Sequence, residues 1–276
     1  MLTFDKGYFN LGYLDTLAYK DTFIHRLDPR TKLITAISFV FMVVSFPRYE
    51  LSGLIPFFIF PVFMAIMGEV PAGFILKRVI LVSPFVLFVA IFNPLLDTTT
   101  MYNLDGIRIT GGWVSFFSII MRFVLTISIA LILMATTPFH AICHAIERLS
   151  VPRVFVVQLL FLYRYIFVLA EEGMRMVRAV NMRRFKGGMH DMNLVINLLG
   201  VLFVKTMERA ERIYQCMSSR GFDGEVRLLQ RYKIRFTDIA FAIITITAFI
   251  AFRRYDVTKV IGEIVLRLMQ WHLVSF

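Results

Sequence analysis

The sequence predicts an all-α membrane protein, a polytopic bundle of about five to six transmembrane helices with long amphipathic helices on its cytoplasmic side. Composition is the first reason, because 58% of the residues are apolar, the mean hydropathy is +0.72 and only 18% are charged. Soluble domains are about 45–50% apolar. The other two reasons are a series of long apolar segments and an uneven distribution of basic residues among the loops.

The apolar segments meet or approach the length of about 17 to 25 residues that crosses a bilayer. Five are predicted to span it: Leu33–Phe46, Leu51–Met67, Val79–Phe92, Trp113–Ala135 and Phe236–Phe252. The first and third are short, so their helices must extend beyond these bounds. Residues 1–32 mix acidic and basic side chains without a continuous apolar run, so we expect no cleavable signal peptide.

The basic residues indicate which loops are cytoplasmic. Residues 136–235 hold sixteen and residues 1–32 hold five, whereas the 94–112 loop holds only Arg108. The positive-inside rule therefore places the N-terminus and residues 136–235 in the cytoplasm. Arg253 and Arg254, after the last span, do not fit this pattern. We expect a multi-pass protein of the cell (inner, cytoplasmic) membrane with the lipid bilayer as a partner.

The chain is expected to have three parts: a membrane bundle of four spans over 1–135, coupling helices over 136–235, and a final span with an amphipathic segment over 236–276. At the start of the first span, Asp28 is placed to cap a helix that has Pro29 at its first position. The polar 93–112 loop has turn signals and could form a small hairpin.

After Pro138 the apolar residues alternate with charges, which is typical of amphipathic helices. Two glycines, Gly187 and Gly188, separate long helices that we expect at about 153–185 and about 192–220. The segment Val154–Ala170 is apolar enough for a sixth crossing, but it contains Arg164, and a position at the membrane interface fits better.

Each long helix ends with an arginine, Arg183 in the first and Arg220 in the second. If the helices cross, these arginines lie at opposite ends, where two copies of one partner could bind. The simpler alternative is that the arginines interact with the helix macrodipole and that Gly221 is an ordinary glycine after a helix end.

Two further groups could be functional. Arg122 lies near the middle of the fourth span, where a charge is costly, so it should face the bundle or a partner. It is either a hinge or partner contact, or a buried arginine paired to carbonyls or to an acid. His140, Cys143 and His144 share one helical face. That spacing suits a metal, but no complete ligand set is evident, so we expect no metal site. Both cysteines, Cys143 and Cys216, are expected to be packing residues.

Several functions are disfavoured. The chain has no Gly-x-x-x-x-Gly-Lys-Ser/Thr phosphate loop, no evident catalytic constellation and no nucleic-acid reader motif. We therefore expect a protein that is not an enzyme, has no cofactor and does not bind nucleic acid. A membrane-bound enzyme that uses His140, Cys143 and His144 is a remote alternative.

Four stretches together resemble one known family. They are His25–Leu33, Thr136–Pro138 with Ala145–Arg153, Tyr163–Tyr165, and Arg209–Phe222. In this order they resemble the T component of energy-coupling factor (ECF) transporters. That family carries two short arginine motifs, usually Ala-Arg-Gly, at the ends of cytoplasmic coupling helices. The stretches Arg178–Phe185 and Gly12–Thr16 are most similar to the branch that serves cobalt or nickel uptake.

The resemblance implies two cytoplasmic ATP-binding cassette ATPase subunits and a substrate-binding membrane subunit as partners, with ATP hydrolysed by the ATPases. It implies coupling motifs at Met182, Arg183 and Arg184, and at Ser219, Arg220 and Gly221. Arg184 and Ser219 depart from the usual motif. The alternatives are a T component of a vitamin transporter and a stand-alone secondary carrier, in which Arg122 would line the pathway.

Overall fold

The computed structural model describes residues 17–96, 100–104, 107–183, 192–224 and 234–254. The chain divides into two compact units. Residues 16–138 and 232–276 belong to the first, the bundle unit, and residues 1–15 and 139–231 to the second, the helix-pair unit. The bundle unit contains α2 (Phe23–Arg26), α3 (Pro29–Val44), η1 (Ser52–Phe58), α4 (Ile59–Met67), α5 (Ala72–Ala90), α6 (Phe92–Leu96), α7 (Gly111–Thr136) and α11 (Phe236–Arg254).

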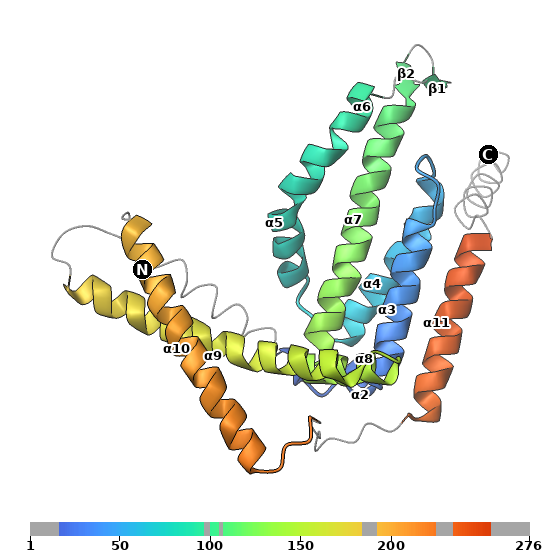
Figure 1. Cartoon of the computed structure of the whole chain (residues 1–276). Helices are drawn as coiled ribbons and strands as arrows, with labels where there is room; N and C mark the ends of the chain where they lie inside the picture. The colour runs from blue at the N-terminus through green and yellow to red at the C-terminus, as the bar shows by residue number, and fades with distance from the viewer. Residues whose placement is uncertain (1–16, 97–99, 105–106, 184–191, 225–233, 255–276) are drawn as a thin grey trace. The chain divides into compact units, whose positions relative to one another are not determined.

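The core of the bundle unit is largely aromatic. Helix α3 packs against α7 and α11, and α5 packs against α7 (Figure 1). Phe249 of α11 lies between Phe39 of α3 and Phe60 of α4, with ring centroids 5.4 and 4.8 Å away. Large apolar side chains on the other faces, such as Leu81 and Phe85 of α5, are exposed, which suits a surrounding of lipid. The predicted class, an all-α polytopic membrane protein, is confirmed.

The spans differ in detail from the predicted bounds. Within the described residues, four helical stretches are long and apolar enough to cross a membrane: Ala72–Leu95, Gly111–Thr136, Arg153–Arg183 and Phe236–Arg254. The third predicted span therefore begins before Val79. The second predicted span corresponds to Ser52–Met67, which begins as the 3-10 helix η1, with Pro56 inside it, and continues as α4. Proline removes a backbone donor, which favours this break from regular α-helix.

A polar cluster joins the starts of α3 and α11. Asp28 is the N-cap of α3, as predicted, and accepts a hydrogen bond from the Arg30 amide at 2.9 Å. Asp238, buried in α11, accepts from the amides of Asp28 at 3.2 Å and Arg235 at 2.7 Å. The buried Lys32 ammonium donates to the Thr136 carbonyl at the end of α7, 2.9 Å away. Three helices are thus tied together at one end of the bundle.

At the other end of α3, two arginines hold the turn that follows the helix. Helix α3 has only 16 residues, whereas α7 has 26. Arg122 of α7 donates to the Pro47 carbonyl at 2.6 Å. Arg253 of α11 donates to the Ser45 carbonyl at 3.1 Å and its guanidinium lies 4.1 Å from the Phe46 ring centroid.

These contacts explain two charges that the sequence left unexplained. Arg122 lies about 17 Å along α7 from its first residue, so the turn after α3 lies beside the middle of α7. Carbonyls at and after a helix end have no intrahelical partner, and a side-chain donor can bond them instead. Arg122 and Arg253 supply these donors. The Arg122 guanidinium is thus paired to a backbone carbonyl, and its role as a hinge or partner contact stays a prediction.

The polar loop before α7 contains the short hairpin that the sequence suggested. Strands β1 (Thr100–Leu104) and β2 (Ile107–Thr110) pair antiparallel, with Thr100 opposite Thr110 and Leu104 opposite Ile107. The hairpin connects α6 to α7 (Figure 1).

The helix-pair unit contains α8 (Phe139–Arg148), α9 (Arg153–Arg183) and α10 (Met192–Ser219). Helix α8 ends at Arg148, and Ser150 after it adopts a left-handed φ of 76°, which allows the Val151 amide to bond the Ile146 carbonyl. Phe139 of α8 stacks on Tyr163 of α9 at a centroid distance of 4.2 Å. The two long helices lie where the sequence predicted them.

Candidate functional site

Helices α9 and α10 form an antiparallel crossing pair. Glu172 of α9 accepts from Lys205 of α10 at 3.0 Å, and Gly173 faces Leu202. Further along, Phe161 contacts Phe222, which follows α10, at a centroid distance of 6.3 Å. The residue numbers rise on one helix as they fall on the other, so the C-terminal ends of the two helices lie at opposite ends of the pair, as Figure 1 shows.

The first arginine motif lies at the end of α9. Arg183 is the last residue of the helix and is exposed, and the preceding Met182 is 79% exposed. Arg183 lies eleven residues beyond Glu172, or about 16 Å from the contact with α10. Arg184 lies outside the described residues. This end of α9 therefore exposes a positive charge and a large apolar side chain.

The second motif has a well-defined local geometry. The Phe222 amide bonds the Met217 carbonyl at 3.1 Å and the Gly221 amide bonds the Ser218 carbonyl at 3.0 Å, which is the Schellman pattern. Gly221 has φ +74°, a conformation that side chains rarely adopt. Arg220 is therefore the C-cap of α10, exposed and fixed by the turn that follows it.

Two neighbours secure this end of α10. Phe222 packs against Phe161 of α9, so the turn is attached to the partner helix. The Ser219 hydroxyl donates to the Gln215 carbonyl one turn back, at 2.8 Å. The Ser219 hydroxyl is thus bonded within its own helix. Gly221 is the predicted C′ glycine, and the turn at this glycine also fixes the backbone position from which the Arg220 side chain extends.

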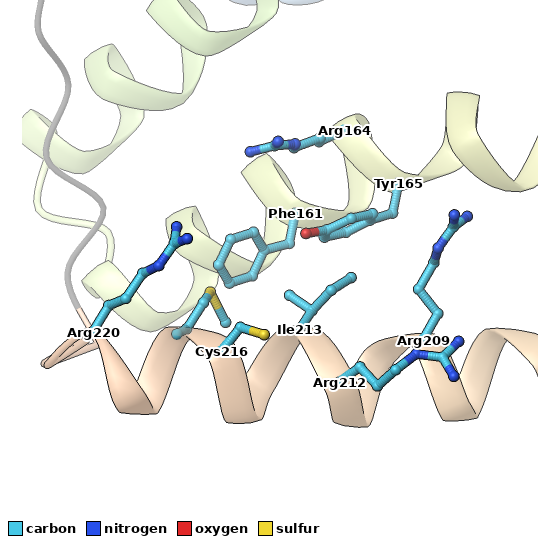
Figure 2. A pocket seen from close by; sticks show the side chains of 9 residues that line it. Phe161, Arg164, Tyr165, Arg209, Arg212, Ile213, Cys216 and Arg220 are labelled. Atoms are coloured by element: carbon cyan, nitrogen blue, oxygen red, sulfur yellow. The ribbon is translucent and has the colours of Figure 1, made fainter.

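A groove between the two helices runs up to Arg220. Phe161, Arg164 and Tyr165 of α9 line one side of it, and Arg209, Arg212, Ile213, Cys216, Met217 and Arg220 belong to α10 (Figure 2). Its volume is about 380 Å³. Cys216 is exposed here, so our expectation that it is a packing residue was wrong.

The basic residues of the groove were not predicted as a site. Arg209, Arg212, Cys216 and Arg220 follow one another at intervals of three and four residues, which places them on one face of α10. That periodicity was visible in the sequence. The contribution of Arg164 depends on the crossing of α9 and α10, which periodicity alone does not give.

The other candidate residues lie elsewhere. Arg122 belongs to the bundle unit, in contact with the Pro47 carbonyl. Cys143 of α8 is fully buried, and burial raises the pKa of its thiol to about 11, so at neutral pH it is a packing thiol and not a thiolate ligand. Among the residues that the structure describes, no three His, Cys, Asp or Glu side chains are grouped to hold a metal ion.

Comparison with known proteins identifies the family. The model of the family CbiQ, cobalt transport protein, matches residues 20–232, which cover most of both units, without α11, and contain both arginine motifs. The chain belongs to the CbiQ family. The resemblance noted from four short stretches therefore holds over most of the sequence, and the protein is a multi-pass membrane protein.

Curated relatives agree with this assignment. An uncharacterized protein of Methanocaldococcus jannaschii is 29% identical over 81% of this chain and 79% of its own length. The energy-coupling factor transporter transmembrane protein of Bacillus subtilis is 29% identical over 73% of this chain and 81% of its own length. The protein of the same name from Lacticaseibacillus paracasei is 28% identical over 74% of this chain and 82% of its own length.

Proposed function

We propose that this CbiQ-family protein is the transmembrane coupling subunit of an ATP-driven uptake transporter of the ECF type. Two cytoplasmic ATPase subunits bind to it, one at Arg183 and one at Arg220, and a separate membrane subunit binds the substrate. The chain transmits work from the ATPases and carries out no catalysis of its own. The observation that carries this proposal is one exposed arginine at each of the opposite ends of two crossing helices.

The geometry suits two identical partners. Arg183 and Arg220 lie about 16 and 22 Å beyond the Glu172–Lys205 contact, on different sides of the crossing. A guanidinium on a helix end can enter a groove of a partner and form charge-assisted hydrogen bonds, the kind of contact that dominates interface energies. Movement of either ATPase then displaces one end of a rigid helix.

The membrane-facing partner has a separate surface. Helix α10 exposes an apolar stripe, Met192, Ile196, Leu199, Phe203 and Met207, each at least half exposed. Their spacing of three and four residues keeps them on one face. We propose that this stripe contacts the substrate-binding subunit, and that α9, with charges such as Glu171 and Arg175, lies at the cytoplasmic surface of the bilayer.

Cobalt or nickel ions are the proposed cargo, supported by the family description as a cobalt transport protein. A vitamin as cargo is the alternative, because several relatives are named energy-coupling factor transmembrane proteins without a solute. Uptake of radioactive cobalt and nickel by cells expressing this chain with its partners distinguishes the two.

Co-purification tests the coupling role. The double variant Arg183→Glu and Arg220→Glu should lose the ATPase subunits while keeping a folded bundle, because both anchors are reversed in charge. Arg178→Glu, an exposed arginine of α9 away from its end, is the matched control and should retain them. Retention of the ATPases by the double variant contradicts the proposal. Transport by this chain alone would favour a stand-alone carrier.

A further inference from the structure

The groove between α9 and α10 concentrates positive charge. Four of its nine lining residues are arginines, Arg164 from α9 and Arg209, Arg212 and Arg220 from α10, and none of the nine is acidic. Figure 2 shows their guanidinium groups around the groove. The adjoining depression differs, because Glu172 and Glu208 line it together with Lys205. Arg209 and Arg212 line both hollows, so Glu172 and Glu208 lie on the side of these two arginines that faces away from Arg220, whereas no carboxylate lines the groove itself.

The floor of the groove is apolar. Phe161 and Tyr165 of α9 and Ile213 and Met217 of α10 line the groove together with the arginines. A small inorganic anion would pair with the guanidinium groups and leave this floor uncovered. A ligand that satisfies the whole groove has an anionic head and an apolar part, since burial of apolar surface adds to the charge-assisted bonds.

The surroundings indicate that this ligand is a lipid. Helix α9 is apolar enough to rank with the membrane-crossing helices, alone among the described helices of its unit. Phe155, Leu162 and Ile166 on its surface are about half exposed or more. Clustered arginines beside such a surface attract the anionic headgroups of the cytoplasmic leaflet. A guanidinium group can donate two hydrogen bonds to the oxygens of one phosphate in a bidentate geometry, which an ammonium group cannot do.

We propose that the groove formed by Arg164, Arg209, Arg212 and the Phe161–Tyr165 segment binds the phosphate headgroup of an anionic phospholipid. This site goes beyond the coupling role but rests on the proposed position of α9 and α10 at the membrane surface. It places a lipid next to Arg220, so lipid occupancy and docking of a partner at that end of α10 are linked.

Native mass spectrometry of the full-length chain in mild detergent tests this site without any ATPase present. The probes are phosphatidylglycerol and phosphatidylcholine with identical acyl chains, titrated separately. The wild type should retain phosphatidylglycerol at least about tenfold better, and free inorganic phosphate should compete poorly. Arg209→Gln with Arg212→Gln should abolish the preference. The control Arg175→Gln with Arg178→Gln makes the same charge change outside the groove and should keep it.

Three results overturn the proposal. Equal retention of the two lipids by the wild type shows that the headgroup charge is not recognised. If the groove variant and its control prefer phosphatidylglycerol over phosphatidylcholine to the same extent, the groove arginines have no special role, because the same change of charge elsewhere has the same effect. Loss of ATPase co-purification by the groove variant with unchanged lipid preference assigns the groove to an acidic protein partner. Circular dichroism spectra of both variants check that they are folded.

Discussion

Arg253 illustrates how a charge at the end of a membrane helix is explained by one contact. It donates to the Ser45 carbonyl and covers the Phe46 ring, whereas its neighbour Arg254 is exposed. Arg253→Gln should therefore destabilise the bundle by about 2 kcal/mol, the sum of a charged hydrogen bond and a cation–π contact. Arg254→Gln should have little effect. Thermal unfolding in detergent measures both effects. Equal unfolding temperatures for the two variants would show that the contacts of Arg253 with Ser45 and Phe46 do not stabilise the bundle.

Gly221 and Gly200 form a natural pair for testing the end of α10. An added Cβ would meet nothing within 4 Å at either position, but only Gly221 has a left-handed φ, +74°. Gly221→Ala should therefore loosen the last turn by about 1 kcal/mol, whereas Gly200→Ala should stabilise the helix interior. Hydrogen exchange over residues 214–222 reads this directly. Exchange in Gly221→Ala no faster than in wild type would mean that the turn does not require glycine.

At the scale of elements, the starts of α3 and α11 depend on Asp238. Asp238→Ala leaves the Asp28 and Arg235 amides without their acceptor in a buried site, which should cost about 2–4 kcal/mol. Asp21→Ala removes an exposed ion pair with Arg26 and should leave the unfolding temperature unchanged. A similar unfolding temperature for the two variants would show that the polar cluster does not join the helices.

The elements show what the sequence could and could not predict. The bounds of α9 and α10 were predictable because charges, Gly221 and the glycine pair before α10 are local signals. The cap by Asp28 was predictable for the same reason. The role of Asp238 was not, since its partner lies 210 residues away in the chain. Arg122 was recognised as unusual, but its carbonyl partner follows from the shortness of α3 relative to α7.

The groove is an intermediate case. Its α10 arginines repeat at helical spacing, which the sequence contains, but the apolar floor and Arg164 come from α9. Only the antiparallel crossing brings these two sets together, because Phe161 then faces Met217 and Phe222. A surface built from two helices is determined by their register, and register depends on tertiary contacts such as Glu172 with Lys205.

The whole molecule consists of a membrane bundle and a helix pair with one exposed arginine at each end. The bundle unit has an aromatic core and exposes apolar faces to lipid, while the helix pair carries both motifs. Since the two motifs lie on different helices, each ATPase should bind independently of the other. Each single charge reversal should then remove one ATPase and leave the other in place.

The number of bound ATPase subunits tests this claim most directly. Native mass spectrometry of the purified complex should show two ATPase subunits with the wild type and with Arg178→Glu. It should show one with Arg183→Glu, one with Arg220→Glu and none with both. Two ATPase subunits on either single variant would contradict the account, as would the loss of both from one single variant whose bundle remains folded.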